Sequence, residues 1–254
     1  MNEPPRIGTA GWVIPRASVL HGVSEGTHLQ RYARQFSCAE INSSFHRSHA
    51  LAQYVKWAAV TPPGFRFAVK LPRVITHDQK LRRPRLPLAR FLAETSGLGS
   101  RRGPLLVQLP PSHAFDSRVA GRFFEHFRQH YGGSIACEPR HPSWFSGAAD
   151  RLLDSYEVAR VAADPPRAGG AHLPGGWGGL RYFRLHGSPR IYWSRYSADF
   201  IESVADALRR AAASAETWCV FDNTAAGGAI ENAWELQRRL APRTADSTTD
   251  TCPA

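Results

Sequence analysis

Ionisable and amide side chains stand at the ends of short apolar runs throughout this sequence. These residues are Glu40, Asn42, Lys70, Gln108, Glu138, Arg140, Asp164, Arg184, His186 and Asp222. Carboxylates held close together shift one another's pKa and can serve as general acids and bases, and a histidine beside them titrates near neutrality. If the runs end at one edge of a sheet, the sequence therefore predicts a site for acid–base chemistry at that edge.

The acidic groups and the histidine are the predicted catalytic residues: Glu40, Glu138, Asp164, His186 and Asp222. Glu138 or Asp164 would be the base, and His186 the acid or a proton shuttle. Three cations would hold the negative charge of a substrate: Lys70, Arg140 and Arg184. The alternative is a structural ring of ion pairs, because buried charges must be paired. We favour catalysis, since apolar residues would stabilise these positions better than charges do.

Two glycine-containing loops could hold an anion. Residues 186–190 follow the seventh apolar run, and residues 223–229 follow the eighth and open a helical pattern. Backbone N–H groups at a helix N-terminus favour anions, and these two loops form the usual phosphate site of barrel enzymes. The rest of the predicted substrate site is Asn42, Gln108, Arg190, Asn223, Thr224, Gly227 and Gly228. We therefore predict a small phosphorylated or otherwise anionic ligand. Under the alternative, the glycines only permit tight turns.

Other chemistries fit the pattern less well. The four carboxylates and His186 could ligate a divalent cation, but no H-x-H or H-x-x-x-H pair stands at the end of a run, so we predict no metal and no cofactor. Glu40 paired with Glu138 or Asp222 would suit a glycosidase, which also needs aromatic sugar platforms. The sequence has no Gly-x-Ser-x-Gly nucleophile elbow.

The elements that must position these side chains alternate along the chain. Predicted strands cover residues 6–10, 38–42, 66–70, 105–109, 134–138, 159–164, 181–186 and 217–222. Predicted helices cover residues 28–36, 51–60, 89–97, 118–130, 148–156, 200–213 and 229–240, with Asp116 and Ser197 near two N-termini as caps. This order predicts an α/β fold, a single (β/α)8 TIM-like barrel whose mouth collects the polar strand ends. A doubly wound sheet is disfavoured because no Gly-x-Gly-x-x-Gly turn follows the first strand.

Composition places the chain among globular proteins. It has 254 residues, of which 43% are hydrophobic, and no signal peptide or run of roughly 20 apolar residues, so we expect a cytoplasmic protein without membrane contact. Its four cysteines form no C-x-x-C pair and are expected to be free thiols. Residues 1–242 are the predicted barrel domain, and the polar residues 243–254 are predicted to be disordered.

Several short motifs resemble those of the DUF72 (YecE-like) family. They are GTAGW at 8–12, EINSSF at 40–45, TPPGFRFAVK at 61–70, GPLLVQLPP at 103–111, EPRHPSW at 138–144, YFRLHG at 182–187, RYS at 195–197 and FDNT at 221–224. The resemblance covers residues 6–240 in order and implies a TIM-barrel-like fold, but it supplies no activity. His46 stands where the family usually has an aromatic residue such as Tyr, and Cys38-Ala39 replaces the more usual valine.

The net charge is +11, from 32 basic and 21 acidic residues, and only three of the basic residues are lysines. An arginine-rich genome would give this bias to every protein that it encodes, so the net charge alone is a weak indication of nucleic-acid binding. The segment 66–102 concentrates the charge, with ten basic residues and two acidic ones, and could overhang the barrel mouth. A nucleic-acid-binding or nucleic-acid-processing protein and a non-catalytic ligand sensor or partner protein are therefore kept as alternatives. The sequence does not give the oligomeric state.

Overall fold

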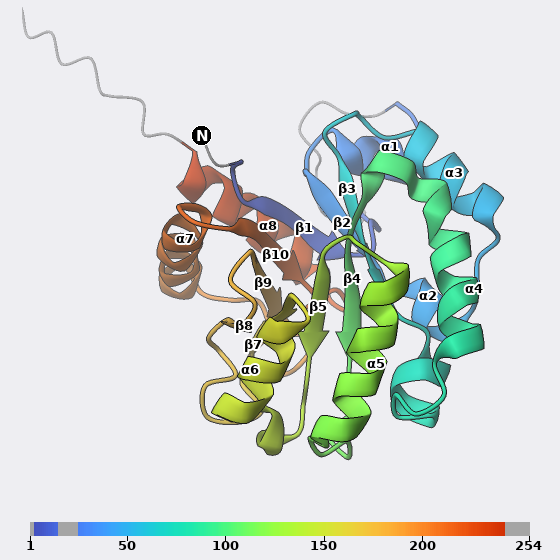
Figure 1. Cartoon of the computed structure of the whole chain (residues 1–254). Coiled ribbons are helices and arrows are strands. Elements are labelled where there is room, and N and C mark those ends of the chain that lie inside the picture. The colour runs from blue at the N-terminus through green and yellow to red at the C-terminus, as the bar shows by residue number, and fades with distance from the viewer. Residues whose placement is uncertain (1–2, 15–24, 242–254) are drawn as a thin grey trace, which may run out of the picture.

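The computed structural model describes residues 3–14 and 25–241, which form a parallel barrel wrapped by helices (Figure 1). Its strands are β1 (Arg6–Ala10), β2 (Cys38–Ile41), β3 (Arg66–Lys70), β4 (Arg102–Gln108), β5 (Ile135–Glu138), β6 (Val158–Arg160), β7 (Ala162–Asp164), β8 (Gly175–Gly176), β9 (Leu180–Leu185) and β10 (Glu216–Phe221). Its α-helices are α1 (His28–Ala33), α2 (Ser43–His46), α3 (Leu51–Ala59), α4 (Arg85–Thr95), α5 (Ser117–His130), α6 (Gly147–Ser155), α7 (Ala198–Ala212) and α8 (Gly228–Leu240). The predicted barrel fold is confirmed.

One strand position of the barrel is split into two halves. The strands lie in the order β7-β9-β10-β1-β2-β3-β4-β5-β6-β8. β6 pairs in parallel with β5, whereas β7, which begins two residues after β6 ends, pairs in parallel with β9. Val161 lies between the halves, and its N–H still donates to the Cys137 carbonyl on β5 at 2.8 Å. The predicted strand 159–164 therefore bends from one neighbour to the other and nearly closes the barrel.

The barrel interior is filled by alternate residues of the strands. Small side chains such as Ala68, Ala136 and Ala159 face Tyr182 and Trp218, whose rings stack with centroids 5.9 Å apart. All five are fully buried. This alternation of large and small residues fills the space inside a closed sheet, so the body of the barrel is a packed core and the chemistry is confined to its ends.

The helices begin where the sequence provides caps. The Asp116 side chain accepts from the N–H groups of Arg118 and Val119 at the start of α5, and Ser197 accepts from Phe200 at the start of α7. The apolar face of α5, which includes Phe123 and Phe127, is buried against the sheet. The helical spacing of these apolar residues thus gives α5 one face that packs against the barrel.

The segment between β3 and β4 differs most from the expected pattern. A π-helical turn (Val74–Asp78) follows β3, and α4 begins at Arg85, four residues before the predicted start. Pro87 is compatible with this earlier start because the first turn of a helix needs no N–H donors. Short 3-10 turns at Ser96–Arg101 and Pro142–Trp144 were also not predicted. The predicted disordered tail, residues 243–254, lies outside the described residues, and none of the described helices is long and apolar enough to cross a membrane.

Candidate functional site

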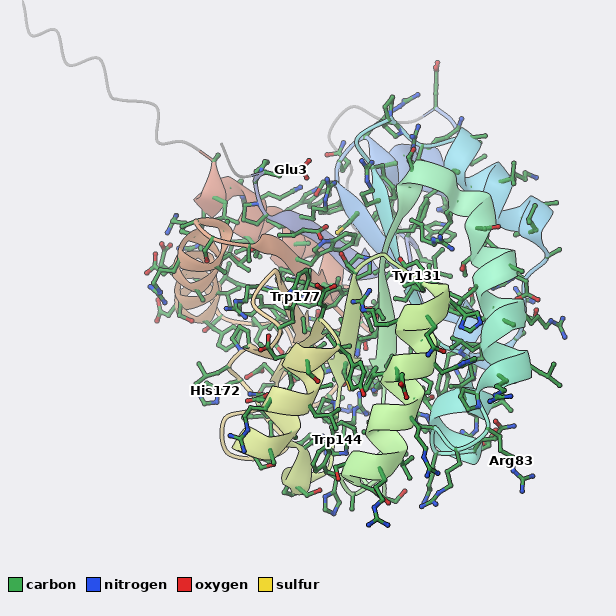
Figure 2. All side chains as sticks on the ribbon, in the orientation of Figure 1. Glu3, Arg83, Tyr131, Trp144, His172 and Trp177 are labelled. Carbon is green, nitrogen blue, oxygen red and sulfur yellow. The ribbon has the colours of Figure 1, made fainter. Side chains whose placement is uncertain are left out.

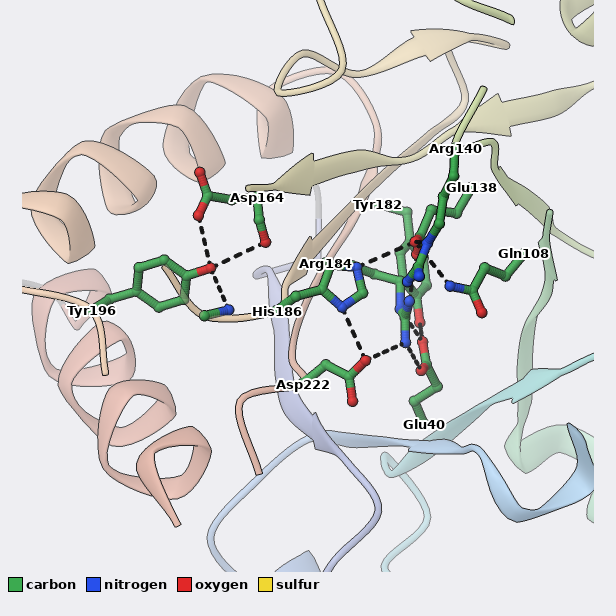
Figure 3. Close-up of polar contacts among 11 residues, drawn as sticks. Glu40, Gln108, Glu138, Arg140, Asp164, Tyr182, Arg184, His186, Tyr196 and Asp222 are labelled. Carbon is green, nitrogen blue, oxygen red and sulfur yellow. Dashed lines mark hydrogen bonds and ion pairs between the residues drawn. The ribbon is translucent and has the colours of Figure 1, made fainter. Parts of the chain in front are cut away.

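A buried arginine joins three carboxylates at the C-terminal end of the barrel (Figure 3). Arg184 on β9 is fully buried. Its Nε and Nη2 donate to the two oxygens of Glu40, at 3.0 and 2.6 Å. Its Nη1 donates to Glu138 Oε2, and its Nη2 also donates to Asp222 Oδ2 at 3.1 Å. Four side chains from four strand positions therefore form one connected network.

Strand register explains why these residues meet. Glu40 on β2 points inward, on the same side as Cys38, because residues two apart in a strand share a face. Gln108 and Glu138 end adjacent strands and are direct neighbours across β4 and β5. On β9, Tyr182 and Arg184 share the inward face, and the Tyr182 hydroxyl donates to Glu40 Oε2 at 2.8 Å. The network thus occupies the last inward layer of the barrel.

His186 is held between two carboxylates. Its Nδ1 lies 3.0 Å from Asp222 Oδ2, and its Nε2 lies 3.2 Å from Glu138 Oε1. Burial lowers the pKa of His186, but the Glu138 carboxylate and the hydrogen bonds to Asp222 and Glu138 outweigh burial, so the pKa is raised. Both ring nitrogens therefore act as donors in the protonated form. A proton shuttle needs a free ring nitrogen, which this arrangement does not offer until a ligand displaces one carboxylate.

Glu138 has both oxygens occupied. Its Oε1 accepts from Gln108 at 3.2 Å, from Arg140 at 3.0 Å and from His186, while its Oε2 accepts from Arg184. Burial raises the pKa of Glu138, but Arg184 and then His186 and Arg140 outweigh burial, so the pKa is well below its usual range. Because both oxygens already accept hydrogen bonds, Glu138 offers no open oxygen to a substrate proton, which argues against its predicted role as the proton acceptor.

Asp222 and Lys70 each have a polar atom without such a partner. Asp222 Oδ1 accepts no hydrogen bond from a residue that the structure describes, and the Asp222 side chain is 12% exposed, against 0% for Glu40 and 2% for Glu138. Burial raises the pKa of Asp222, but Arg184 and His186 outweigh it, so the group is a carboxylate at neutral pH. Lys70 Nζ, at the end of β3, likewise has no hydrogen bond or ion pair within the described chain and lies 4.2 Å from the centre of the Phe45 ring.

Asp164 is outside the network. Its Oδ1 accepts from the Tyr196 hydroxyl at 2.9 Å, on the far side of His186 from Glu138 in Figure 3. The cause is the split strand, because β7 is bent onto β9 and its last residue faces the loop before α7. The predicted role of Asp164 as a base beside Glu138 has no geometric support.

The predicted anion loops have packing explanations of their own. The Asn223 amide donates to the carbonyl of Ser194 at 2.9 Å and to Asn232 at 3.0 Å. Gly227 has φ +77°, and a Cβ on Gly228 would lie 2.7 Å from Arg195 Cγ. These glycines are therefore required by the turn and by close packing.

The remaining predicted loop residues lie at the edge of the site. The Arg190 guanidinium lies 4.3 Å from the centre of the Trp193 ring, and Asn42 precedes α2 with its Oδ1 buried and without a hydrogen bond. Thr224 and Gly227 line a cavity of about 290 Å³ with Thr9, and no cation is among its described lining residues. The loop cavity thus lacks the positive side chains that an anion site would use.

Sequence reasoning missed Tyr182 and Phe45. Tyr182 stands two residues before Arg184, so its place on the inward face could have been read from strand periodicity. Phe45 belongs to α2, a four-residue helix too short for a periodic signal. Within the described residues, no group of three or more His, Cys, Asp and Glu side chains is arranged to hold a metal ion.

The mouth beside His186 is basic. A small pocket of about 10 Å³ there has Glu138, Arg140, Arg167 and His186 among its lining residues. The three network carboxylates are accompanied by four groups that can carry positive charge: Lys70, Arg140, Arg184 and His186. The positive groups outnumber the negative ones when all are ionised, so the site's field favours anions.

Fold and site together define a TIM-barrel protein with a buried arginine–carboxylate network at its C-terminal mouth. A sequence model of DUF72, described as a protein of unknown function, matches residues 6–254, and the chain belongs to this family. UPF0759 protein YecE of Escherichia coli K12 is 32% identical over 165 residues, 62% of this chain and 58% of YecE. UPF0759 protein YunF of Bacillus subtilis is 28% identical over 183 residues, 66% of this chain and 63% of YunF. The chain thus matches less than two thirds of the length of either relative.

Two crystal structures of DUF72 family proteins have the same fold. The protein from Thermotoga maritima has a TM-score of 0.76 at 24% identity, covering 94% of this chain and all of its own. The protein from Enterococcus faecalis has a TM-score of 0.77 at 20% identity, covering 92% of this chain and 94% of its own. At these identities the likeness concerns the fold.

Proposed function

We propose that this protein binds a small anionic substrate at the C-terminal mouth of the barrel and converts it by acid–base chemistry. The observation that carries the proposal is the contrast within the polar layer. Arg184, Glu40 and Glu138 have their polar atoms engaged with one another, whereas Asp222 Oδ1 and Lys70 Nζ have no such partners among the described residues. The unengaged atoms are the ones that can meet a ligand.

The buried network supports this role by fixing geometry. Burying ion pairs is costly, and apolar residues of similar volume often stabilise a fold as well or better. A fully buried Arg184 between Glu40, Glu138 and Asp222 holds the Asp222 carboxylate in one orientation, because Oδ2 is bonded to both Arg184 and His186. A catalytic group held by neighbours in this way loses little freedom when substrate binds.

The proposed roles differ from those expected from the sequence. Asp222 is the base, through Oδ1, and Lys70 and Arg140 face the negative charge of the substrate. Glu40 and Glu138 are positioning residues, since their oxygens hold Arg184. The two carboxylates favour the protonated form of His186, and in that form it stabilises the charge of Asp222 and can return a proton once substrate displaces a contact.

The test is thermal unfolding with a panel of phosphorylated, sulfated and carboxylated small molecules. A ligand at one hundred times its Kd stabilises the native state by about 2.7 kcal/mol, which raises the Tm of a barrel of this size by about 5–10 °C. We expect such a rise for at least one anion, and its loss in Lys70→Gln. Lys56→Gln is the matched control, because Lys56 is exposed on α3. If no anion raises the Tm, or if both variants respond equally, the proposal is wrong.

The same panel tests the acid–base step. A stabilising compound incubated with the wild type should be converted to product, and Asp222→Asn should bind it with little change in Tm response but convert it slowly. Binding without conversion in the wild type would support the alternative of a non-catalytic sensor.

A further inference from the structure

We infer that Lys70 is a covalent catalytic residue, whose amine forms an imine with an aldehyde or ketone that also carries an anionic group. The inference rests on the proposed function, because it assumes that the mouth binds a small anion. It adds that the anion also has a carbonyl carbon that Lys70 can attack. The position of the Lys70 side chain supports the inference.

Lys70 is fixed at its backbone, whereas its amine makes no hydrogen bond or ion pair with a residue that the structure describes. It is the last residue of β3, and its carbonyl accepts from the Ser44 hydroxyl at 2.6 Å, which ties the strand end to α2. Its side chain is partly exposed, and Nζ lies 4.2 Å from the centre of the Phe45 ring. Two arginines of the barrel, in contrast, have their guanidinium groups in ion pairs. Arg140 is paired with Glu138, and Arg160 is paired with Asp150.

The surroundings of Lys70 favour the neutral amine. Burial lowers its pKa first, and the Arg184 cation lowers it further, while Glu40, Glu138 and Asp222 partly offset the shift and leave the pKa at about 8. His77 also faces Lys70, but the pKa of His77 is lowered to about 4, so it adds no positive charge at neutral pH.

A lysine with this pKa is a usable nucleophile near neutral pH. With a pKa of about 8, about a tenth of the Lys70 side chains are neutral amines at pH 7, whereas an ordinary lysine is neutral in fewer than about one molecule in 1,000. Burial and a neighbouring cation are the means by which enzymes activate lysines for attack on carbonyl groups.

The step balances without any further reactant. The lone pair of Lys70 Nζ attacks the carbonyl carbon, a C–N bond forms as the C=O π bond breaks, and one proton moves from nitrogen to oxygen to give a neutral carbinolamine. A second proton, taken from solvent, protonates the hydroxyl. The C–O bond then breaks and water leaves as the nitrogen lone pair forms the C=N bond, and because nitrogen keeps its last hydrogen, the product is the protonated imine. Asp222 is the group in reach of the mouth that can carry the proton between nitrogen and oxygen. The positive imine is then stabilised by the carboxylates that already act on Lys70.

The same surroundings define the substrate class. The carbonyl compound must carry a negative group, because Arg140 lies at the edge of the same mouth. It must also be small at the carbonyl end, because Phe45 packs against the amine. Small keto acids and phosphorylated aldehydes or ketones meet both requirements.

Reductive trapping tests the inference. The full chain is incubated with pyruvate or glyoxylate and sodium borohydride, whose hydride reduces an imine to a stable secondary amine, and the labelled peptides are mapped by mass spectrometry. The chain suits this assay because it has three lysines, Lys56, Lys70 and Lys80, plus the N-terminal amine. We expect the label at Lys70 at least tenfold above Lys56 and Lys80 in the folded protein, with the preference lost after unfolding in urea.

Two readouts on the wild type separate this inference from the proposed function. A rise in Tm with inorganic phosphate or sulfate reports anion binding, whereas only borohydride trapping with a carbonyl compound reports the imine. Lys70→Arg, which removes the nucleophile, should abolish the trapped label. Equal labelling of the three lysines, or no label at Lys70 with either probe, would overturn the imine. If anions still stabilise the wild type in that case, the proposed binding function survives; if none does, both fail.

Discussion

Replacing Arg184 with methionine removes the cation around which the buried network is built. Glu40 and Glu138 would then be left without their main counter-charge, and their side chains are 0% and 2% exposed. Breaking a buried ion pair by removing one partner costs about 3–5 kcal/mol, because the other charge stays buried. Since a domain is stable by about 5–15 kcal/mol in total, we expect a large fraction of the stability to be lost.

Urea unfolding from pH 7 to pH 2 measures this loss and its cause. In the wild type, the lowered pKa values of Glu138 and Asp222 contribute stability that is complete above the unfolded values of about 4 and is lost as the pH falls below them. Arg184 is the main source of the lowering of both pKa values, so the gap between wild type and Arg184→Met should be largest near pH 7 and should narrow as the pH falls below about 4. A loss below about 1 kcal/mol, or a gap that does not change with pH, would refute this reasoning.

Arg160→Met is the matched control. Arg160 is also buried, but it pairs with one carboxylate, Asp150, whose side chain is 34% exposed. Asp150 can be solvated when its partner is lost, so the cost should be smaller than for Arg184→Met and should depend less on pH.

Three further substitutions test separate parts of the site. His186→Asn should lower the free energy of unfolding most below pH 6.5 and progressively less as the pH rises. The raised pKa of His186 contributes stability that is present below the unfolded pKa and is lost as the pH rises through the folded pKa. Urea unfolding at pH 6 and pH 9 measures this loss, and a loss that grows with pH contradicts the expectation. Tyr182→Phe removes one hydrogen bond to Glu40 and should cost about 1.5–3 kcal/mol in the same assay, whereas no loss would show that water replaces the hydroxyl. Arg82, Arg83 and Arg85 are exposed, so reversing their charges should leave the Tm within about 2 °C of the wild type. Stopped-flow measurement at low salt should show slower association of an anionic ligand. Equal association rates would show that the segment does not steer anions.

The barrel could be predicted because its strands follow a strict pattern. In β2 the buried Ala39 and Ile41 pack in the outer core, while Cys38 faces the interior, as the alternation requires. The predicted bounds of β1 and β3 are those of the structure, since loop signals limit both runs. The predicted boundaries were wrong where polar residues extend an element beyond its apolar run, as at Arg102, where β4 begins.

The membership of the polar layer was more predictable than the bonding inside it. Period-two spacing places Glu40, Arg184 and their neighbours at the mouth, but it does not say which oxygen meets which nitrogen. Whether a carboxylate is engaged, like Glu138, or has an open oxygen, like Asp222, depends on distances of tenths of an ångström across the barrel. The sequence could therefore not distinguish positioning residues from reactive ones.

Two arginines of the basic segment 66–102 form ion pairs at the surface. Arg73 pairs with Asp78 at 3.1 Å and Arg90 pairs with Glu94 at 2.7 Å. Both arginines are exposed and line a surface cavity of about 490 Å³ beside α4. Arg83 also projects from the surface (Figure 2). Nucleic-acid binding through this segment would rest on its exposed arginines, and it should weaken steeply as salt rises.

Backbone chemical-shift mapping with the anion that raises the Tm most locates the binding site directly. We expect the shifted amides to cluster at the C-terminal ends of β2, β3, β5, β9 and β10, around Glu40, Lys70 and Asp222. The competing location is the cavity at the opposite end of the barrel, which Arg6 and Arg66 line. Shifts centred on that cavity, or on the exposed arginines of the basic segment, would contradict the account.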